Sequence, residues 1–161
     1  MTTRLIPMAR PNISEREREL VGEVMASDIL ALGPMAERFE QAVADVAGRR
    51  HGVSCSSGTA GLHMVVRSLD IGPGDEVITT PFSFVASANC LLYEHARPRF
   101  VDIEPDTLGI DPAAVASAAG PRTVGVLPVH VFGRPSRIEA LEDLATAHGW
   151  HLIEDAYEAL G

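Results

Sequence analysis

The order of apolar and polar residues predicts two helices near the start of the chain. Apolar residues recur at helical spacing over residues 14–28 and again over 34–46, which gives each segment one apolar face. Ser14 and Glu17 have the spacing of a capping box. Pro34 suits the first turn of the second helix because its missing N–H would have no partner there, and Gly48 ends the pattern.

From residue 52 onward, short apolar segments alternate with helical ones. The predicted strands cover 52–55, 76–79, 99–103, 123–129 and 150–154. The predicted helices cover 59–69, 84–94, 111–119 and 136–148. Asp111 and Ser136 are the expected N-caps of the last two, with Glu139 three residues after Ser136. This alternation is typical of an α/β fold, a mostly parallel sheet with helices on both faces.

The pattern shows no internal repeat and no linker, so residues 1–161 are expected to form part of one domain. Only six residues follow Asp155, and none of them predicts a helix that would cover the last strand. We therefore expect the chain to be a truncated, N-terminal portion of a larger domain.

Composition narrows the classes of protein. A chain of 161 residues with 46% hydrophobic residues is sufficient for a packed core. The net charge of −9 argues against a nucleic-acid partner. Residues 1–10 lack the apolar core of a secretory signal and no apolar run spans a membrane, so a cytoplasmic location is expected. Cys55 and Cys90 are too few for a disulfide framework and are expected to be buried.

Candidate chemistry lies where the predicted strands end, since ligands of open parallel sheets bind at the carboxyl ends of strands. After the first strand, residues 56–61 lead directly into a helix, whose free N–H groups and dipole suit an anion such as phosphate. The same segment is also explained by simple helix capping. Phe84 follows the second strand, where a core position is the plainer interpretation.

The later strands end in three ionisable residues. Asp102 is explained by turn formation, and His130 by a hydrogen-bonded interior histidine. Asp155 closes an apolar strand, where a carboxylate requires a cationic partner. Glu154 should point the other way, because side chains alternate along a strand.

Other kinds of site are excluded by what the sequence lacks. It contains no Gly-x-Gly-x-x-Gly fingerprint, and all 13 basic residues are arginine, so a Gly-x-x-x-x-Gly-Lys phosphate loop is impossible. His148 and His151 have no accompanying cysteine or histidine cluster, so no metal site is expected.

Seven motifs in register carry a resemblance to a known family. They are Leu32-Gly33-Pro34 with Phe39-Glu40, Ser57-Gly58-Thr59-Ala60, Gly72-Pro73-Gly74-Asp75-Glu76-Val77, Pro81-Phe82-Ser83-Phe84-Val85-Ala86, Phe100-Val101-Asp102-Ile103, Pro128-Val129-His130-Val131-Phe132-Gly133 and Ile153-Glu154-Asp155-Ala156. Together they resemble the DegT/DnrJ/EryC1/StrS family of sugar aminotransferases. The resemblance implies the large domain of a fold type I enzyme that uses pyridoxal phosphate, followed by a small C-terminal domain, in a homodimer.

The resemblance also implies an activity. Many members transfer an amino group from glutamate or glutamine to a keto sugar, usually a nucleotide-linked one, in nucleotide sugar biosynthesis. Others act on cyclitols, and a few are dehydratases.

The resemblance assigns cofactor contacts to six residues. The phosphate-binding turn corresponds to three of them, Gly58, Thr59 and Ala60. Phe84 matches the aromatic residue that stacks on the cofactor ring. Asp155 matches the carboxylate that keeps the pyridine nitrogen protonated. Glu158 falls near the ring hydroxyl, where many members have glutamine or histidine, and an ionised glutamate there cannot donate a hydrogen bond.

The lysine that forms the family's Schiff base is expected beyond Gly161, in a Ser-x-x-x-x-Lys pattern. No catalytic residue is therefore expected in this chain, which should be inactive alone. Two alternatives stay open. One is that the parent protein is a sugar dehydratase with histidine in place of the lysine. The other is that the chain is a complete, non-catalytic binding protein.

Overall fold

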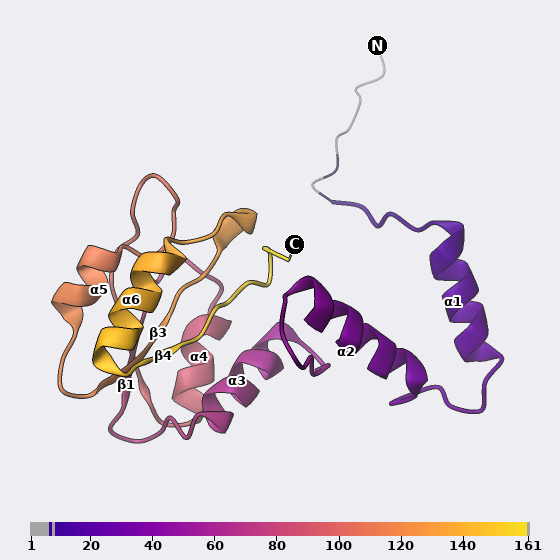
Figure 1. The fold of residues 1–161 in the computed structure, drawn as a ribbon, viewed down its shortest axis with the longest axis horizontal. Coiled ribbons are helices and arrows are strands. Elements are labelled where there is room, and N and C mark those ends of the chain that lie inside the picture. The colour runs from indigo at the N-terminus through magenta and orange to yellow at the C-terminus, as the bar shows by residue number, and fades with distance from the viewer. Residues whose placement is uncertain (1–6, 8, 161) are drawn as a thin grey trace, which may run out of the picture.

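The computed structural model describes residue 7 and residues 9–160. Residues 1–6, 8 and 161 lie outside it, and with them most of the segment in which no secretory signal was expected. The elements, in chain order, are α1 (Glu15–Met25), α2 (Pro34–Val46), α3 (Gly58–Ser68), β1 (Glu76–Thr79), α4 (Ala86–Tyr93), β2 (Arg97–Phe100), α5 (Pro112–Ala118), β3 (Thr123–Leu127), the 3₁₀ turn η1 (Val131–Gly133), α6 (Ile138–His148) and β4 (His151–Leu152) (Figure 1).

The four strands form a parallel sheet in the order β2-β1-β3-β4. Val77 and Leu127 pack with α3 and α4 in one apolar cluster, whereas Ile78 and Val126 pack with α5 and α6 in another. Neighbouring residues of one strand thus face opposite clusters, as the alternation of side chains along a strand requires. The predicted α/β fold, a parallel sheet with helices on both faces, is confirmed.

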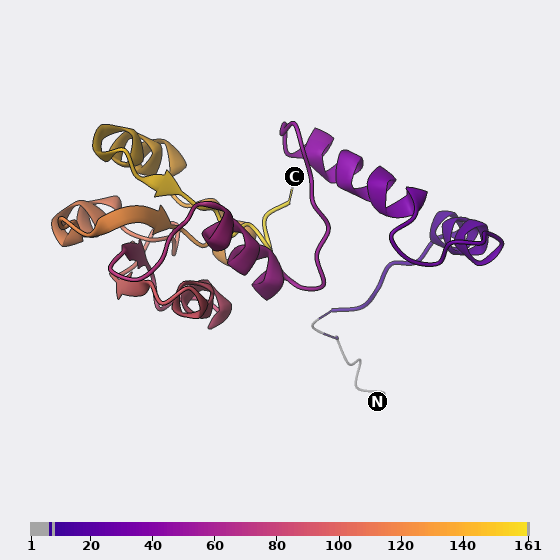
Figure 2. The same cartoon turned by 90° about the horizontal axis from the view of Figure 1, so that it is seen from below.

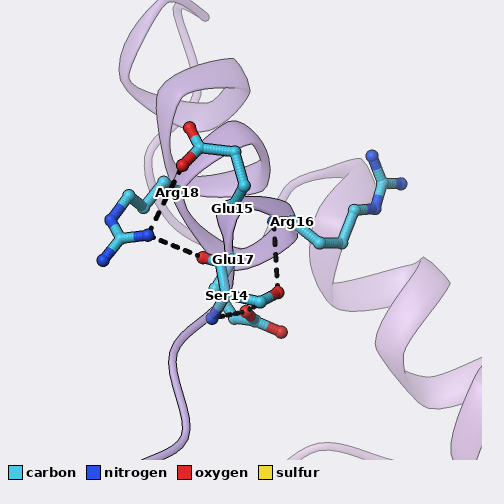
Figure 3. Close-up of polar contacts among 5 residues, drawn as sticks. All are labelled: Ser14, Glu15, Arg16, Glu17 and Arg18. Atoms are coloured by element: carbon cyan, nitrogen blue, oxygen red, sulfur yellow. Dashed lines mark hydrogen bonds and ion pairs between the residues drawn. The ribbon is translucent and has the colours of Figure 1, made fainter.

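The N-terminal helices extend away from the sheet (Figures 1 and 2). Ser14 caps α1 by accepting a hydrogen bond from the N–H of Arg16, and Glu17 completes the predicted capping box (Figure 3). No residue of α1 is buried, and Phe39 on the apolar face of α2 is 60% exposed. The predicted apolar faces exist, but among the described residues they are largely uncovered, and Ala44 of α2 is the one buried residue in the two helices.

The strand predicted over 52–55 is wrong, so the sheet has four strands rather than five. Here the N–H of Ser54 donates to Glu40 Oε1 at 2.7 Å, and its hydroxyl donates to the same atom at 2.6 Å. A Cβ on Gly52 would lie 2.4 Å from the carbonyl oxygen of Glu40. Because Gly52 has no side chain, the segment can lie against α2. There the carboxylate of Glu40, and not a neighbouring strand, accepts the backbone hydrogen bond.

Three smaller predictions also need correction. β2 begins two residues earlier than predicted, because Arg97 already pairs with Glu76 of β1. Ser136 is not an N-cap: it is buried, its hydroxyl donates to the carbonyl of Val129, and α6 begins at Ile138. Cys90 is buried as expected, but Cys55 is exposed.

Within residues 9–160, every helix is too short or too polar to cross a lipid bilayer.

Candidate functional site

A cavity of about 630 Å³ opens at the carboxyl ends of the strands. Its lining comes mainly from residues 57–59, 81–84 and 129–132, together with Asp155, Tyr157 and Glu158. The first group begins α3, the second follows β1, the third follows β3 and the last follows β4. Segments that lie up to about 100 positions apart in the sequence meet at this edge, which is where a parallel sheet is expected to bind ligands.

The start of α3 supplies backbone donors to the cavity. Ser57 is the N-cap, and its hydroxyl accepts from the N–H of Ala60 at 3.1 Å. Gly58 and Thr59 line the cavity and belong to the first turn, where N–H groups have no partner within the helix. Ala60 does not line the cavity and its N–H is already used by the cap. The free donors and the helix dipole make this turn suitable for a phosphate.

Gly58 also allows a close contact across the cavity mouth. A Cβ built on Gly58 would lie 3.2 Å from Cδ2 of Tyr157, a distance tighter than ordinary van der Waals contact. The absence of a side chain at residue 58 therefore leaves room for the close approach of the turn and the segment after β4.

Asp155 is fixed in the cavity wall by its backbone and its side chain. Its N–H donates to the carbonyl of Pro128 at 2.9 Å, and its carbonyl accepts from the N–H of His130 at 3.0 Å. These bonds continue the pairing of β3 and β4 beyond the ends of both strands. The Ser87 hydroxyl donates to Oδ2 of Asp155 at 3.0 Å.

A cationic partner was expected for Asp155, and among the described residues its side chain bonds a hydroxyl instead. A cation that neutralises this carboxylate therefore has to come from a ligand or from protein outside the described residues.

Phe84 presents a flat apolar face to the cavity, since it lines the wall and is 76% exposed. The expectation of a core position for this residue is therefore wrong. Phe82 and Phe132 stand edge to face beside it, with ring centroids 6.3 Å apart. An exposed aromatic face of this kind suits stacking against a planar ring.

Glu158 is held at the cavity by the turn after β3. Its Oε2 accepts from the N–H of Phe132 at 2.7 Å. Phe132 has a φ of +57°, in the left-handed region that is uncommon for residues other than glycine. Gly133 follows with a φ of +80°, and a Cβ there would lie 2.9 Å from the Glu158 carbonyl oxygen. The glutamate and the strained turn thus fix each other.

His130 is an interior histidine, as predicted. It is buried, and Nδ1 accepts from the N–H of Ser136 at 3.1 Å. Nε2 therefore carries the proton and faces Glu154 Oε2 at 3.1 Å. Glu154 also lies 3.7 Å from Arg49 and does not line the cavity, in agreement with the expected alternation of Glu154 and Asp155. Asp102 is not part of this site and serves its turn, with Oδ1 accepting from the N–H of Ile103.

The residues behind Asp155 are buried. Cys90 is fully buried there, and burial, assisted by the negative charge of Asp155, raises the pKa of its thiol to about 11. Its Sγ contacts the carbonyl of Ser87 at 3.4 Å. Across residues 7 and 9–160, no three side chains of the metal-binding types gather into one site.

Ser87 and Tyr157 were not predicted from the sequence as site residues. A weak signal existed for Ser87, which lies one helical turn after Ser83 and stands among apolar residues of the predicted helix. Tyr157 gave no signal, because its role depends on the close approach of Gly58 from a distant segment.

A family model for the DegT/DnrJ/EryC1/StrS aminotransferases matches residues 11–161. The chain belongs to this family. Solved structures agree: DesV from S. venezuelae, in complex with a ketimine intermediate, is 37% identical and superposes with a TM-score of 0.88 over 91% of this chain. DesI, determined with its TDP-sugar product, is 39% identical with a TM-score of 0.83 over 94% of this chain. NtdA from Bacillus subtilis, with bound cofactor PMP, is 32% identical with a TM-score of 0.84 over 92%.

The DegT/DnrJ/EryC1/StrS chain described here spans only part of these proteins. It covers 40% of DesV, 39% of DesI and 35% of NtdA. Pyridoxal phosphate is the cofactor of this family, and PMP is the amine form of the same compound. The resemblance in sequence and the resulting expectation about fold are both confirmed.

Proposed function

We propose that residues 1–161 are the N-terminal portion of the cofactor-binding large domain of a pyridoxal-phosphate aminotransferase. One observation carries the proposal: a helix N-terminus, an exposed aromatic face and a fixed carboxylate line the same cavity. Each suits one part of the cofactor, respectively the phosphate, the ring and the pyridine nitrogen. DesI with its TDP-sugar product supports a nucleotide-linked keto sugar as the acceptor. The family resemblance adds a cyclitol as a second kind of acceptor, and glutamate or glutamine as the amino donor.

The residues present fit the cofactor. The first turn of α3 offers N–H groups from Gly58 and Thr59 to the phosphate. Phe84 offers its face to the ring. Asp155 has one carboxylate oxygen bonded by Ser87, which leaves the other for a protonated pyridine nitrogen. Glu158 has one oxygen bonded by the N–H of Phe132, which leaves the other to accept from the ring hydroxyl.

When bound, pyridoxal phosphate supplies the electron sink that lets an amino group pass from donor to acceptor. The chain's own residues prepare the site for that chemistry. Asp155 would hold a proton on the pyridine nitrogen by charge, and Phe84 would stack against the ring. The helix N-terminus would hold the phosphate. The sequence contains no lysine, so the Schiff-base residue has to come from protein outside these residues, and this chain alone should be inactive.

Two other functions are compatible with the same cavity. A sugar dehydratase of this family would keep the cofactor contacts and differ at the lysine position, which lies outside this sequence. A non-catalytic binding protein would keep the phosphate turn and Asp155, and the total absence of lysine favours it. The homodimer and the cytoplasmic location expected from the sequence stay predictions.

An amino-transfer assay on the whole protein that contains these residues tests the proposal. Cofactor-loaded protein is incubated with glutamate or glutamine and a TDP-linked keto sugar, and the aminated sugar and the 2-oxo acid are measured. Equal amounts of both products are expected. Removal of oxygen from the sugar without amination would favour the dehydratase. A protein that neither absorbs as a cofactor complex nor aminates any keto sugar or cyclitol would overturn the proposal.

A further inference from the structure

A pair of serines lies at the wall of the cavity, where Ser83 belongs to the lining and Ser87 lies behind it. Ser87, on α4, is 1% exposed and does not line the cavity itself. Its Oγ is 3.0 Å from Oδ2 of Asp155, a residue 68 positions further along the chain. The Oγ of Ser83, one helical turn earlier, is 2.5 Å from the Oγ of Ser87. We infer that Ser87 is a positioning residue that aims Asp155 at the pyridine nitrogen of the cofactor, an inference that rests on the proposed function.

The direction of these hydrogen bonds follows from the donors available. An ionised carboxylate only accepts, so the Ser87 hydroxyl has to donate to Asp155. The carbonyl of Phe84, at 3.3 Å, is the competing acceptor, but it is neutral and further away. A charged acceptor makes the stronger bond. Ser87 Oγ is then free to accept from Ser83. The Ser83 hydroxyl also lies 3.1 Å from the carbonyl of Phe84, but its contact with Ser87 is shorter, so the two hydroxyls form one chain that ends at Asp155.

Ser87 gives the Asp155 side chain a single orientation. Its backbone is fixed by Pro128 and His130, but these bonds leave the side-chain torsions free. Ser87 removes that freedom by binding Oδ2, which leaves Oδ1 as the carboxylate oxygen available to a ligand in the cavity that Asp155 lines. The nearby thiol of Cys90 cannot take the place of Ser87, because it is fully buried, donates to the carbonyl of Ser87 and is a weaker donor than a hydroxyl.

Removal of the Ser87 hydroxyl should therefore change the cofactor rather than only the fold. Without this hydroxyl, Oδ2 would be a buried acceptor with no hydrogen-bond partner, which costs free energy. The carboxylate would therefore turn toward the solvent in the cavity. The protonated pyridine nitrogen would lose its counter-charge, so the pKa of that nitrogen would fall.

The test uses the whole protein that contains these residues, with Ser87→Ala, Ser87→Thr and Ser68→Ala. Ser68 is the matched control, since within the described part of the chain its hydroxyl bonds only the carbonyl of Val65 on α3. Two quantities are measured: the affinity for pyridoxamine phosphate by fluorescence titration, and the pH midpoint of the bound cofactor's absorption spectrum. For Ser87→Ala, binding should weaken roughly tenfold, as for a lost hydrogen bond to a charged group, and the pH midpoint should move lower.

Ser87→Thr keeps the hydroxyl and should restore both values, and Ser68→Ala should match the wild type. A purely structural role would lower the melting temperature without moving the pH midpoint. If Ser87→Ala does not fold, Ser83→Ala should shift the midpoint in the same direction by less. If Ser87→Ala keeps the wild-type affinity and pH midpoint, the role of Ser87 is contradicted and the proposed function is not. The same holds for Ser83→Ala if only that variant folds. A wild-type protein that does not bind pyridoxamine phosphate would overturn the proposed function as well.

Discussion

Asp155 and Gly58 show how single residues make the site. Asp155 follows a two-residue strand, and it is fixed by two backbone hydrogen bonds that extend the pairing of β3 and β4 and by one side-chain bond from Ser87. Gly58 contributes by having no side chain, because a Cβ there would press on the ring of Tyr157. One residue supplies a charge and the other supplies space, and both lie on segments that only the tertiary fold brings together.

Substitution of Gly58 should weaken cofactor binding. In Gly58→Ala the new methyl group would lie 3.2 Å from Tyr157 and displace either the ring or the phosphate turn. We expect a loss of about 1 kcal/mol in the binding free energy of pyridoxamine phosphate, typical of mild overpacking. Gly120→Ala is the control, since a Cβ at Gly120 meets no atom within 4 Å. Equal affinities of the two variants in calorimetric titrations would contradict the assignment.

Cys90 should make stability fall at alkaline pH. Burial raises the pKa of this thiol from 9.0 to about 11, so the folded state keeps a proton that the unfolded state loses between these values. Its contribution to stability is complete below pH 9 and is lost as the pH rises toward 11. Urea unfolding from pH 8 to 11 should show a shallower decline in Cys90→Ala than in Cys55→Ala, whose thiol is exposed. Parallel declines would count against this explanation.

At the scale of elements, two side-chain helix caps should differ in how much they contribute to the free energy of unfolding. Asp111 Oδ1 accepts from the N–H of Ala113 at 2.9 Å and caps α5, whose Val115 is buried in the core. Ser14 caps α1, in which no residue is buried. Asp111→Ala should therefore lower the free energy of unfolding by about 1 kcal/mol, and Ser14→Ala should leave it nearly unchanged. Urea titrations measure the free energy of unfolding of both variants. Equal losses in the two would contradict this expectation and show that α1 is coupled to the core.

Glu40 should hold the segment that joins α2 to the phosphate turn. Two hydrogen bonds from Ser54 lower the pKa of Glu40, so these bonds persist above its ordinary value of 4.5 and are lost as the pH falls below it. Glu40→Ala should expose the segment around Gly52 to proteases. Glu37→Ala is the matched control, on the same helix and without a side-chain hydrogen bond among the described residues. The idea fails if both variants are cleaved there at the same rate.

Elements set by local signals were predictable, and those set by distant partners were not. β1 was predicted at its observed bounds, and Asp111 with Pro112 marked the start of α5, because strand and cap signals are local. The segment 52–55 has a strand-like pattern, yet Glu40 takes its backbone donor. At the site, strand ends located the cavity, but Ser87 pairs across 68 positions, and no spacing in one sequence encodes that contact.

At the scale of the molecule, large apolar surfaces stay uncovered among the described residues. The aromatic rim of the cavity includes Phe84, Phe132 and Tyr157, each at least 75% exposed. The arm formed by α1 and α2 exposes much of its apolar surface as well. The chain covers only about 40% of the DesV and DesI structures, so the residues that would cover these surfaces are expected in the rest of the whole protein.

The 161-residue chain alone should self-associate and bind a hydrophobic dye, because exposed apolar patches and open sheet edges favour aggregation. Light scattering with a thermal melt checks this expectation. A monodisperse monomer that melts cooperatively and binds no dye would favour the non-catalytic binding protein.

The most direct test of the central claim is the affinity of the whole protein for pyridoxamine phosphate in wild type, Asp155→Asn and Asp102→Asn. Asp155 lines the cavity and Asp102 does not, although both follow strands of the same sheet. Asp102→Asn should bind as wild type does. Asp155→Asn should bind at least about tenfold more weakly, as expected for the loss of a charge-assisted bond. Unchanged affinity in Asp155→Asn would show that the cofactor does not occupy this cavity as proposed.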